Sequence, residues 1–586
     1  MGTSHAKKLL RAALCLCGLC LARCTGQIGT PGTLDLGDDT PQGWAFDPSN
    51  YGKPGALPMP GAPAAPGSAP LPTSPTQPLT CTTKAVGPSP MRRLTHAEYD
   101  NAVADLLGID SNPSADFPPD TLVGLFDNTA SAQTVSSLLA DQYLDSAVAL
   151  ANNIEDLNGL MKCDPAGSSG ANCVKSFVQS FGRRAYRRPL TAAEVSDLVG
   201  VFSETTAASD APTGARFVVA SMLASPFFLF RPEFGAGAAT LPKAKQAAPF
   251  ELASRLGSLL WASVPDDALL DAAANGQLAT RDQVAAQARR MLEDPKAHDA
   301  IQAFYDQWLG LSLLDSATKD AAIYPQFDDA LRTSMTEETR RFISYVLWND
   351  DAKLSTLLSA NYSFVNQPLA KIYGVRGPTS VDEFQKVQLD PTQRTGILTQ
   401  ASLMSAFASP AGSSPIKRGK LVRVRLLCQD LPDPPANIPQ PDPPKQGVST
   451  RERFAMHTNS PACSGCHNLI DGLGFGLEHY DGVGAFRTTD QGVPVDSSGE
   501  INTTMDIDGP YDGGPELAKR LASSDQVQDC APTQWLRYAM ARRETVDDTC
   551  SLVALRDAFA SSGGNLKELM VALTQTDAFL NYRQPE

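Results

Sequence analysis

The sequence lacks the short motifs of the commonest nucleotide-binding and hydrolytic enzymes. It contains no G-x-x-x-x-G-K-[ST] phosphate-binding loop, no H-E-x-x-H zinc motif and no G-x-S-x-G nucleophile elbow. Enzymes that depend on one of these three motifs are therefore excluded. Segments with the alternating pattern of β-strands are also scarce.

Apolar runs long enough to span a membrane are also missing. Lys7, Lys8 and Arg11 form a basic region at the start of the apolar stretch 9–22, which is the pattern of an export signal and too short for a stable span. The other strongly apolar stretch, residues 217–230, is interrupted by Pro226. We expect it to form a buried helix.

Residues 21–24, Leu-Ala-Arg-Cys, resemble a bacterial lipobox, although Arg23 stands where a small residue is usual. We expect residues 1–24 to be signal and lipobox, with Cys24 acylated after cleavage. The alternatives are an ordinary signal peptide cut nearby or a retained anchor. Residues 25–87 are rich in proline, cannot build a core and should form a tether. The chain would then be a periplasmic or cell-surface bacterial lipoprotein that meets the membrane only through its anchor.

Positive charge is scarce, and this limits the partners. The net charge is −15, and it becomes −19 when the signal removes four basic residues: Lys7, Lys8, Arg11 and Arg23. Such a surface repels nucleic acid and anionic lipid, so neither is an expected partner. One basic run, residues 183–188, could contact an acidic polymer or a cofactor carboxylate. We favour the alternative, that it pairs with carboxylates and complements a helix C-terminus.

The sequence does contain Cys463-Ser464-Gly465-Cys466-His467, the C-x-x-C-H signature for attachment of a c-type haem. The two thiols add to the vinyl groups of one porphyrin, and His467 becomes the proximal ligand of the iron. A zinc site would usually need a second C-x-x-C nearby, which is absent. A thioredoxin-like dithiol needs a strand-then-helix context, whereas residues 472–476 indicate a glycine-rich turn. We predict one covalent haem c.

The sixth iron ligand is open between two candidates. Met505 lies 38 residues after His467, on the side where small cytochromes commonly place a distal methionine, and His457 lies ten residues before it. His479 is a third residue near the motif. All three could instead be ordinary surface or core residues, which would leave the site open or with another ligand. No catalytic residue is predicted, because the nearby carboxylates are expected to fix local geometry: Asp471, Glu478 and Asp481.

Six cysteines are left once the signal, the lipid and the haem are assigned, and an even number in an oxidising compartment predicts disulfides. The first expected pair flanks a flexible loop, and the second brackets a predicted helix near the C-terminus. The third pair follows by elimination. The expected bridges are Cys163–Cys173, Cys530–Cys550 and Cys81–Cys428. The disfavoured alternative is a set of reduced, buried thiols.

The body of about 500 residues should be mainly α and divide into several modules. Apolar residues recur at helical spacing, and Thr95–Glu98 and Thr191–Glu194 are capping boxes. Helices are expected over residues 396–407 and 417–428, among others. The expected bounds are 88–160, 161–235 and 236–380 for three helical modules, 381–503 for a cytochrome c-like module with a haem-binding loop, and 504–586 for a small helical C-terminal module.

The body also carries a distinctive order of short segments. They are Arg93–Asn101, Asp105–Gly108, Ala185–Leu190, Ser225–Arg231, Phe250–Leu256, Arg394–Leu398 and the C-x-x-C-H motif. In this order the chain, from Pro88 to Arg583, resembles large secreted, cytochrome c-like proteins of planctomycetes and myxobacteria, which are built from serial domains of unknown function. The resemblance implies a secreted or lipid-anchored haem protein and assigns no reaction. The family usually has Asp-Pro-Leu-Gly-Phe after the haem histidine, whereas residues 471–475 here are Asp-Gly-Leu-Gly-Phe.

Three classes of function fit these features. The first is electron transfer between the haem and an exported redox partner, and the second is a haem enzyme of the peroxidase or oxidase type acting on an extracellular substrate. The third is an extracellular binding scaffold with an accessory haem. We favour electron transfer, because one thioether-bound haem with a candidate methionine is the usual carrier arrangement. A one-haem carrier needs only about 100 residues, so the remaining helical modules should bind something.

Overall fold

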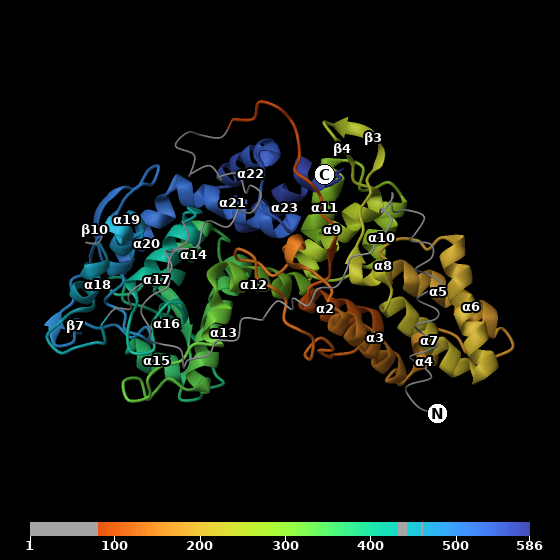
Figure 1. The fold of residues 1–586 in the computed structure, drawn as a ribbon, viewed down its shortest axis with the longest axis horizontal. Coiled ribbons are helices and arrows are strands. Elements are labelled where there is room, and N and C mark those ends of the chain that lie inside the picture. The colour runs from red at the N-terminus through yellow and green to blue at the C-terminus, as the bar shows by residue number, and fades with distance from the viewer. Residues whose placement is uncertain (1–79, 432–441, 459–460, 586) are drawn as a thin grey trace, which may run out of the picture. The chain divides into compact units, whose positions relative to one another are not determined.

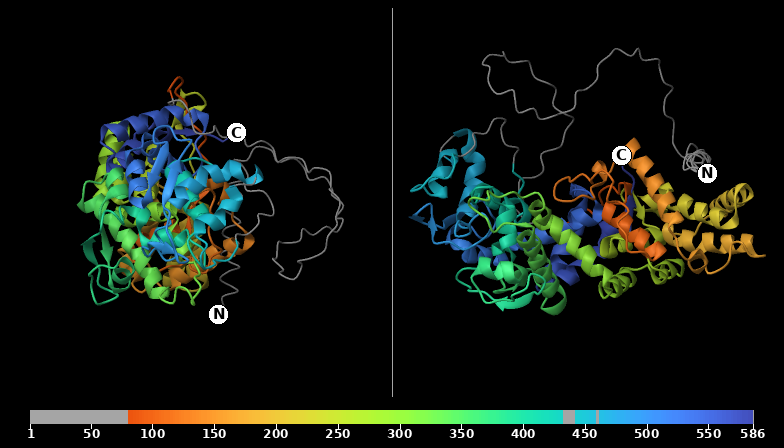
Figure 2. Two further views of the ribbon diagram at one scale, coloured as in Figure 1. Left: turned by 90° about the vertical axis from the view of Figure 1, so that its left-hand side faces the viewer. Right: turned by 90° about the horizontal axis from the view of Figure 1, so that it is seen from below.

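The computed structural model describes residues 80–431, 442–458 and 461–585 (Figures 1 and 2). The predicted signal, the lipobox with Cys24 and most of the tether lie outside these residues. The described chain is mainly α-helical, as the sequence predicts, and its strands are short. None of the described helices combines the length and the apolarity that a membrane crossing requires.

The N-terminal part is a group of helices, two of which start at capping boxes. The hydroxyl of Thr95 accepts a hydrogen bond from the Glu98 amide at the start of α2, and Thr191 and Glu194 repeat the arrangement at α6. The apolar stretch 217–230 is two helices, because the chain turns at Pro226. The elements are β1 (Arg92–Arg93), α2 (His96–Leu107), η1 (Ala130–Ala132), α3 (Ser137–Asn152), α4 (Leu157–Met161), α5 (Gly170–Ala185), α6 (Ala192–Ala208), α7 (Ala211–Leu223), α8 (Pro226–Leu229) and β2 (Phe230–Arg231).

The central part alternates helices with two small antiparallel pairings. Strand β4 lies between β3 and the C-terminal β11, so the end of the chain returns to the middle of the sequence. The elements are β3 (Ala236–Leu241), β4 (Ala244–Gln246), α9 (Pro249–Trp261), α10 (Asp267–Ala274), α11 (Arg281–Leu292), α12 (Lys296–Leu309), η2 (Leu311–Leu314), α13 (Asp329–Asn349), α14 (Leu354–Ser359), β5 (Tyr362–Val365), α15 (Gln367–Tyr373) and β6 (Gln385–Gln388).

The C-terminal part carries the C-x-x-C-H motif and then a helical tail. The helix expected over residues 417–428 is an α-helix that continues as a π-helix. The elements are η3 (Ile397–Thr399), α16 (Ala401–Ala406), α17 (Pro415–Lys420), the π-helix η4 (Leu421–Leu426), α18 (Thr450–Thr458), α19 (Pro461–Phe475), β7 (Thr489–Asp490), β8 (Val493–Pro494), β9 (Ser498–Ile501), β10 (Gly509–Asp512), α20 (Gly513–Ser523), α21 (Asp525–Met540), η5 (Val546–Asp548), α22 (Thr549–Ser561), α23 (Leu566–Thr574), α24 (Asp577–Leu580) and β11 (Asn581–Arg583).

A continuous hydrophobic core joins distant parts of the described chain. It includes buried residues from Phe126 to Phe579. At one point the ring of Phe304 on α12 stacks on Trp535 of α21, with the ring centroids 3.8 Å apart. Both side chains are fully buried. The C-terminal helices therefore depend on packing against helices about 230 residues earlier in the chain.

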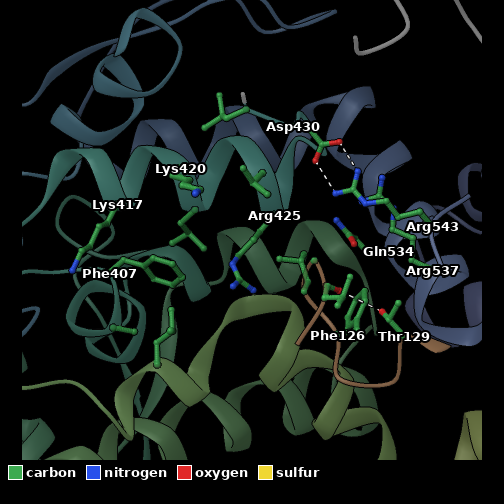
Figure 3. A pocket seen from close by; sticks show the side chains of 18 of the residues that line it. Phe126, Thr129, Phe407, Lys417, Lys420, Arg425, Asp430, Gln534, Arg537 and Arg543 are labelled. Atoms are coloured by element: carbon green, nitrogen blue, oxygen red, sulfur yellow. Dashed lines mark hydrogen bonds and ion pairs between the residues drawn. The ribbon is translucent and has the colours of Figure 1, made fainter. Parts of the chain in front are cut away.

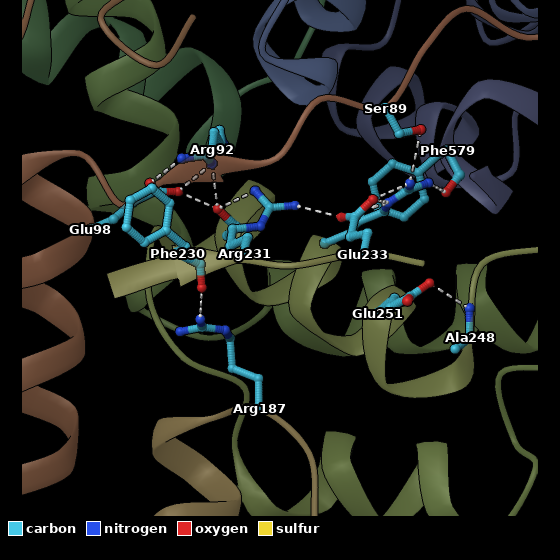
Figure 4. A network of polar contacts seen from close by, with 12 residues as sticks. Ser89, Arg92, Glu98, Arg187, Phe230, Arg231, Glu233, Ala248, Glu251 and Phe579 are labelled. Carbon is cyan, nitrogen blue, oxygen red and sulfur yellow. Dashed lines mark hydrogen bonds and ion pairs between the residues drawn. The ribbon is translucent and has the colours of Figure 1, made fainter. Parts of the chain in front are cut away.

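A buried ion network ties β1, α2, β2 and α9 together (Figure 4). Arg92 donates to Glu98 at 2.7 Å and to the hydroxyl of Ser258 at 2.8 Å, and Arg231 donates to the same hydroxyl. Although burial alone would raise it, the pKa of Glu98 is lowered to about 2, chiefly by the charge of Arg92. Burial lowers the pKa of Arg231 to about 10, so this guanidinium stays charged at neutral pH.

The basic run at residues 183–188 has the structural role that we favoured. Arg183 pairs with Asp271 at 2.7 Å, and Arg188 pairs with Glu194 at 2.7 Å. Arg187 is buried and donates to main-chain carbonyls, including that of Phe227 at 2.9 Å. Through these contacts the basic run holds the C-terminal end of α5 against α10, α6 and α8.

The described cysteines form three disulfides, but two of the predicted pairings are wrong. Cys163–Cys173 is present as predicted, whereas the other bridges are Cys81–Cys550 and Cys428–Cys530. Cys530 lies ten residues before the end of α21, about 15 Å along the helix axis. This places it beside Cys428 at the end of the π-helix and away from Cys550 at the start of α22.

Candidate functional site

Helix α19 carries the whole C-x-x-C-H motif. Residues three and four apart on a helix share one face, so Cys463, Cys466 and His467 belong to one side of α19. Cys466 is half-buried and takes part in no disulfide. The side chain of Cys463 lies outside the described part of the structure. The backbone therefore places the three predicted haem residues on one surface of one helix.

His467 is oriented by a carboxylate one turn further along the helix. Its Nδ1 lies 2.9 Å from Oδ1 of Asp471, and the two side chains are only 12% and 5% exposed. A hydrogen bond at Nδ1 fixes the ring and leaves ligation of a metal to Nε2. From the sequence we expected Asp471 only to fix local geometry. The i, i+4 spacing to His467 was the signal of this contact, and it becomes visible once this segment is known to be helical.

Residues 472–475, the greater part of the glycine-rich turn expected at residues 472–476, are helical. Helix α19 continues through Gly472 and Gly474 to Phe475. A Cβ at Gly472 would lie 2.4 Å from the carbonyl oxygen of Glu500, and one at Gly474 would overlap that of Pro415. These glycines therefore permit close packing of α19 on β9 and α17.

Two buried arginines hold the elements around α19. Arg423 of the π-helix donates through Nε to the carbonyl of Leu469 at 2.9 Å and through Nη1 to that of Asn502 at 2.9 Å. Arg418 of α17 is fully buried and donates to four carbonyls, including that of Leu477 at 2.9 Å. Burial lowers the pKa of Arg418 to about 10. The scaffold beneath the motif therefore rests on charged hydrogen bonds to main-chain oxygens.

The other carboxylates near the motif have structural partners. Glu478 accepts from Arg487 and from Ser413, at 2.9 and 2.7 Å, and its burial raises its pKa. Asp481 accepts from the main-chain amides of Val483 and Ala485, each at 2.9 Å. These contacts agree with the expectation that both carboxylates fix local geometry.

The candidate sixth ligands lie in different surroundings. In His479, Nδ1 lies 2.7 Å from the carbonyl of Arg487 and the ring stacks on Phe486; these contacts fix the ring and, as at His467, leave ligation of a metal to Nε2. Met505 is 44% exposed, and its amide donates to Gln526. The side-chain amide of Asn502 donates to the main-chain carbonyl of Asn468 at 2.7 Å, so the chain leading to Met505 passes beside α19. His457 belongs to α18, which packs against α19, and its side chain lies outside the described part.

The residues of the motif have the spacing that a covalently attached haem requires. Among the described residues, no group of three or more His, Cys, Asp and Glu side chains is arranged to hold an ion. A haem needs from the protein only one imidazole and two thiols on one helix face, and the backbone of α19 provides that spacing. The hydrogen bond that Nδ1 of His467 donates to Asp471 is the support that ligating histidines usually have.

Comparison with known families finds five matches, all to proteins of unknown function. In chain order they are DUF1587 over residues 92–154, DUF1595 over 173–233, DUF1592 over 248–375, DUF1588 over 394–490 and DUF1585 over 509–579. The DUF1588 segment contains the C-x-x-C-H motif. Neither a curated protein nor a solved structure matches the chain. The chain is therefore a serial arrangement of these five domains of unknown function.

Proposed function

We propose that this protein is an exported, lipid-anchored c-type haem protein that transfers electrons to or from an exported partner. The observation that carries the proposal is the contact between His467 and Asp471. It orients the imidazole of a C-x-x-C-H motif and leaves iron ligation to Nε2.

Each residue of the motif has a defined task. Cys463 and Cys466 would hold the porphyrin through thioether bonds, His467 would bind the iron, and Asp471 orients His467. The haem would supply one-electron chemistry when bound. Arg423 and the glycines of α19 hold this helix against its neighbours.

The cysteine distribution supports an exported location. Three disulfides join the cysteines whose side chains are described, other than Cys466. Disulfides persist in oxidising compartments, and these are also the compartments in which c-type haem is attached. A lipid at Cys24 would tether this body to the membrane through residues 25–87.

The proposal is tested by expressing the full chain for export together with a haem-attachment apparatus. The Soret absorbance should stay with the protein after denaturation and acid–acetone extraction. Cys466→Ala should leave at most one thioether, and His467→Ala should abolish the low-spin spectrum, because the imidazole is the strong-field ligand. Haem that extracts freely, or a protein without haem, would refute the proposal.

The lipid anchor is tested separately. The wild type should partition into detergent, and Cys24→Ala should be released or stall uncleaved. A fully soluble wild type whose mature N-terminus is not Cys24 would refute the anchor and leave the haem assignment intact.

A further inference from the structure

A cavity of about 620 Å³ lies in the described part of the chain, away from the C-x-x-C-H motif (Figure 3). Its walls come from the end of α16, from α17, from the π-helix η4, from α21 and from residues 123–129. Neither Cys466 nor His467 lines it. The volume falls within the range of small-molecule binding sites.

Part of the wall is apolar. Phe126, Phe407 and Leu421 line it, and so does Leu313, which is 41% exposed. In Figure 3, Arg425 points into the space between Phe407 and Phe126. An aromatic or aliphatic body can therefore pack beside a positive charge.

The charged part of the wall is almost entirely positive. One carboxylate, that of Asp430, faces six basic side chains, which are Lys417, Lys420, Arg425, Arg537, Arg542 and Arg543. Three of the six are neutralised by carboxylates. These pairs are Arg537–Glu544, Arg542–Asp548 and Arg543–Asp430, with N–O distances of 2.6, 2.7 and 2.9 Å.

The other three basic side chains have no carboxylate partner among the described residues. Lys417 donates to the carbonyl of Ala408, and Arg425 donates to two carbonyls at the end of α12. Lys420 is exposed. Burial lowers the pKa of Arg425 only to about 10, so the guanidinium is charged at neutral pH. Capping α12 explains the position of Arg425, but it does not explain why two lysines face the same cavity.

Gln534 is a second, independent sign of a ligand. Its side chain is fully buried on the cavity wall, and its Oε1 has no hydrogen-bond partner. Its Nε2 lies 3.1 Å from the sulfur of Cys428, which is a weak acceptor. A buried amide oxygen without a partner is destabilising. A ligand hydroxyl or amide would satisfy it, and rotation of the amide by 180° would present a donor instead.

We propose that this cavity binds an amphipathic organic anion, with its acidic group at Lys417, Lys420 and Arg425 and its apolar body against Phe126 and Phe407. The charge balance supports this choice of ligand. The chain carries a net charge of −15, so a cavity with three cations that have no carboxylate partner in the described part of the chain is a local exception on an acidic protein. The inference concerns a separate site and holds whether or not haem is attached to α19.

The test uses the full chain and two probes of nearly equal shape. 1-Anilinonaphthalene-8-sulfonate carries an anionic group, and N-phenyl-1-naphthylamine is its neutral counterpart. Binding is measured by equilibrium dialysis, with the probe quantified in the protein-free chamber, so that haem absorbance does not interfere. We expect saturable binding of about one anionic probe per chain, at least fivefold tighter than that of the neutral probe.

Lys420→Glu should weaken binding of the anionic probe by about fivefold or more and leave the neutral probe unaffected. The control is Lys371→Glu, which makes the same charge change at an exposed lysine of α15 outside the cavity. Val424→Trp, which fills the cavity from the π-helix, should abolish binding of both probes. Both lysines are on the surface, so thermal melting should show wild-type folding for these two variants.

Three results would overturn the proposal. The first is equal affinity for the two probes, and the second is an equal effect of the two lysine variants. The third is the absence of saturable binding of the anionic probe to the wild type at millimolar concentration.

Discussion

The carboxylate of Asp471 lies 2.9 Å from Nδ1 of His467, one turn along the same helix. A main-chain carbonyl at this position would carry only a partial charge, whereas a carboxylate carries a full one. A negative charge at Nδ1 makes the imidazole a stronger electron donor through Nε2. The contact should therefore stabilise the ferric state of an attached haem relative to the ferrous state.

Asp471→Asn should keep the hydrogen bond and remove the charge. We expect the reduction potential to rise by roughly 50 mV, which corresponds to about 1 kcal/mol for one electron. Redox titration followed in the visible spectrum measures this change. The control is Glu500→Gln, which removes an exposed carboxylate of β9 near the same helix. Equal shifts in the two variants would mean that general electrostatics, and not the contact with His467, sets the potential.

The glycines of α19 give a prediction about stability. Gly474→Ala would place a Cβ onto the carbonyl oxygen of Pro415, so α17 and α19 would have to separate. We expect the free energy of unfolding to fall by about 1–3 kcal/mol, measured by denaturant titration. In contrast, Gly200 lies within α6, and apart from the adjacent backbone of that helix no described atom lies within 4 Å of the position that an alanine methyl group would take there. Gly200→Ala should therefore stabilise by up to about 1 kcal/mol. A neutral Gly474→Ala would contradict the close packing.

Local signals in the sequence were sufficient for several parts of the fold. Thr95 and Thr191 begin helices where their capping boxes predict them, because a capping box needs only four consecutive residues. The exchanged disulfide partners depend on tertiary packing. Cys530 faces the π-helix and not α22, and no pattern near Cys530 records this. The glycines at positions 472 and 474 are ambiguous for the same reason, since in sequence a glycine for close packing looks like a glycine for a turn.

In the candidate site, too, the sequence predicts the features with a local signal and misses those that depend on tertiary packing. The C-x-x-C-H motif is contiguous and was found from its residue types alone. The role of Asp471 depends on the helical path of residues 467–471, which the expectation of a turn further along obscured. The cavity was not predicted: Lys420 and Arg425 lie on one continuous helix, but only the fold brings Arg537 of α21 and residues 123–129 beside them.

A buried carboxyl group on α13 should make stability depend on pH. Glu338 is fully buried and accepts from Ser363 and Tyr373, and burial raises its pKa from 4.5 to about 7. Between these values the folded state holds a proton that the unfolded state has released. The free energy of unfolding should therefore fall as the pH rises from about 4.5 to about 7, by about 3 kcal/mol from this group.

Glu338→Gln should remove this part of the pH dependence, as measured by urea titration at several pH values. Glu337→Gln is the matched control, because Glu337 is the neighbouring residue, is 36% exposed and pairs with Arg341 at the surface. The same pH profile in the wild type and in Glu338→Gln would show that Glu338 does not titrate in this range.

The last prediction concerns the sixth iron ligand and separates a carrier from an enzyme. If Met505 ligates the iron, the oxidised protein should show a weak sulfur-to-iron charge-transfer band in the far red. Met505→Ala should then erase the band, lower the reduction potential and open the site to carbon monoxide. If His457 is the ligand, the wild type lacks this band and His457→Ala opens the site.

His479→Gln is the control for both variants and should leave the spectrum unchanged if Met505 or His457 is the ligand; a changed spectrum would identify His479 instead, because its contact with the carbonyl of Arg487 is made by Nδ1 and leaves Nε2 to ligate. Met505 is 44% exposed in the structure, so as a ligand it would have to become covered by the haem or to move toward it. A wild type that already binds carbon monoxide readily would have no strong sixth ligand. That result would contradict simple electron transfer and favour a haem enzyme acting on an extracellular substrate.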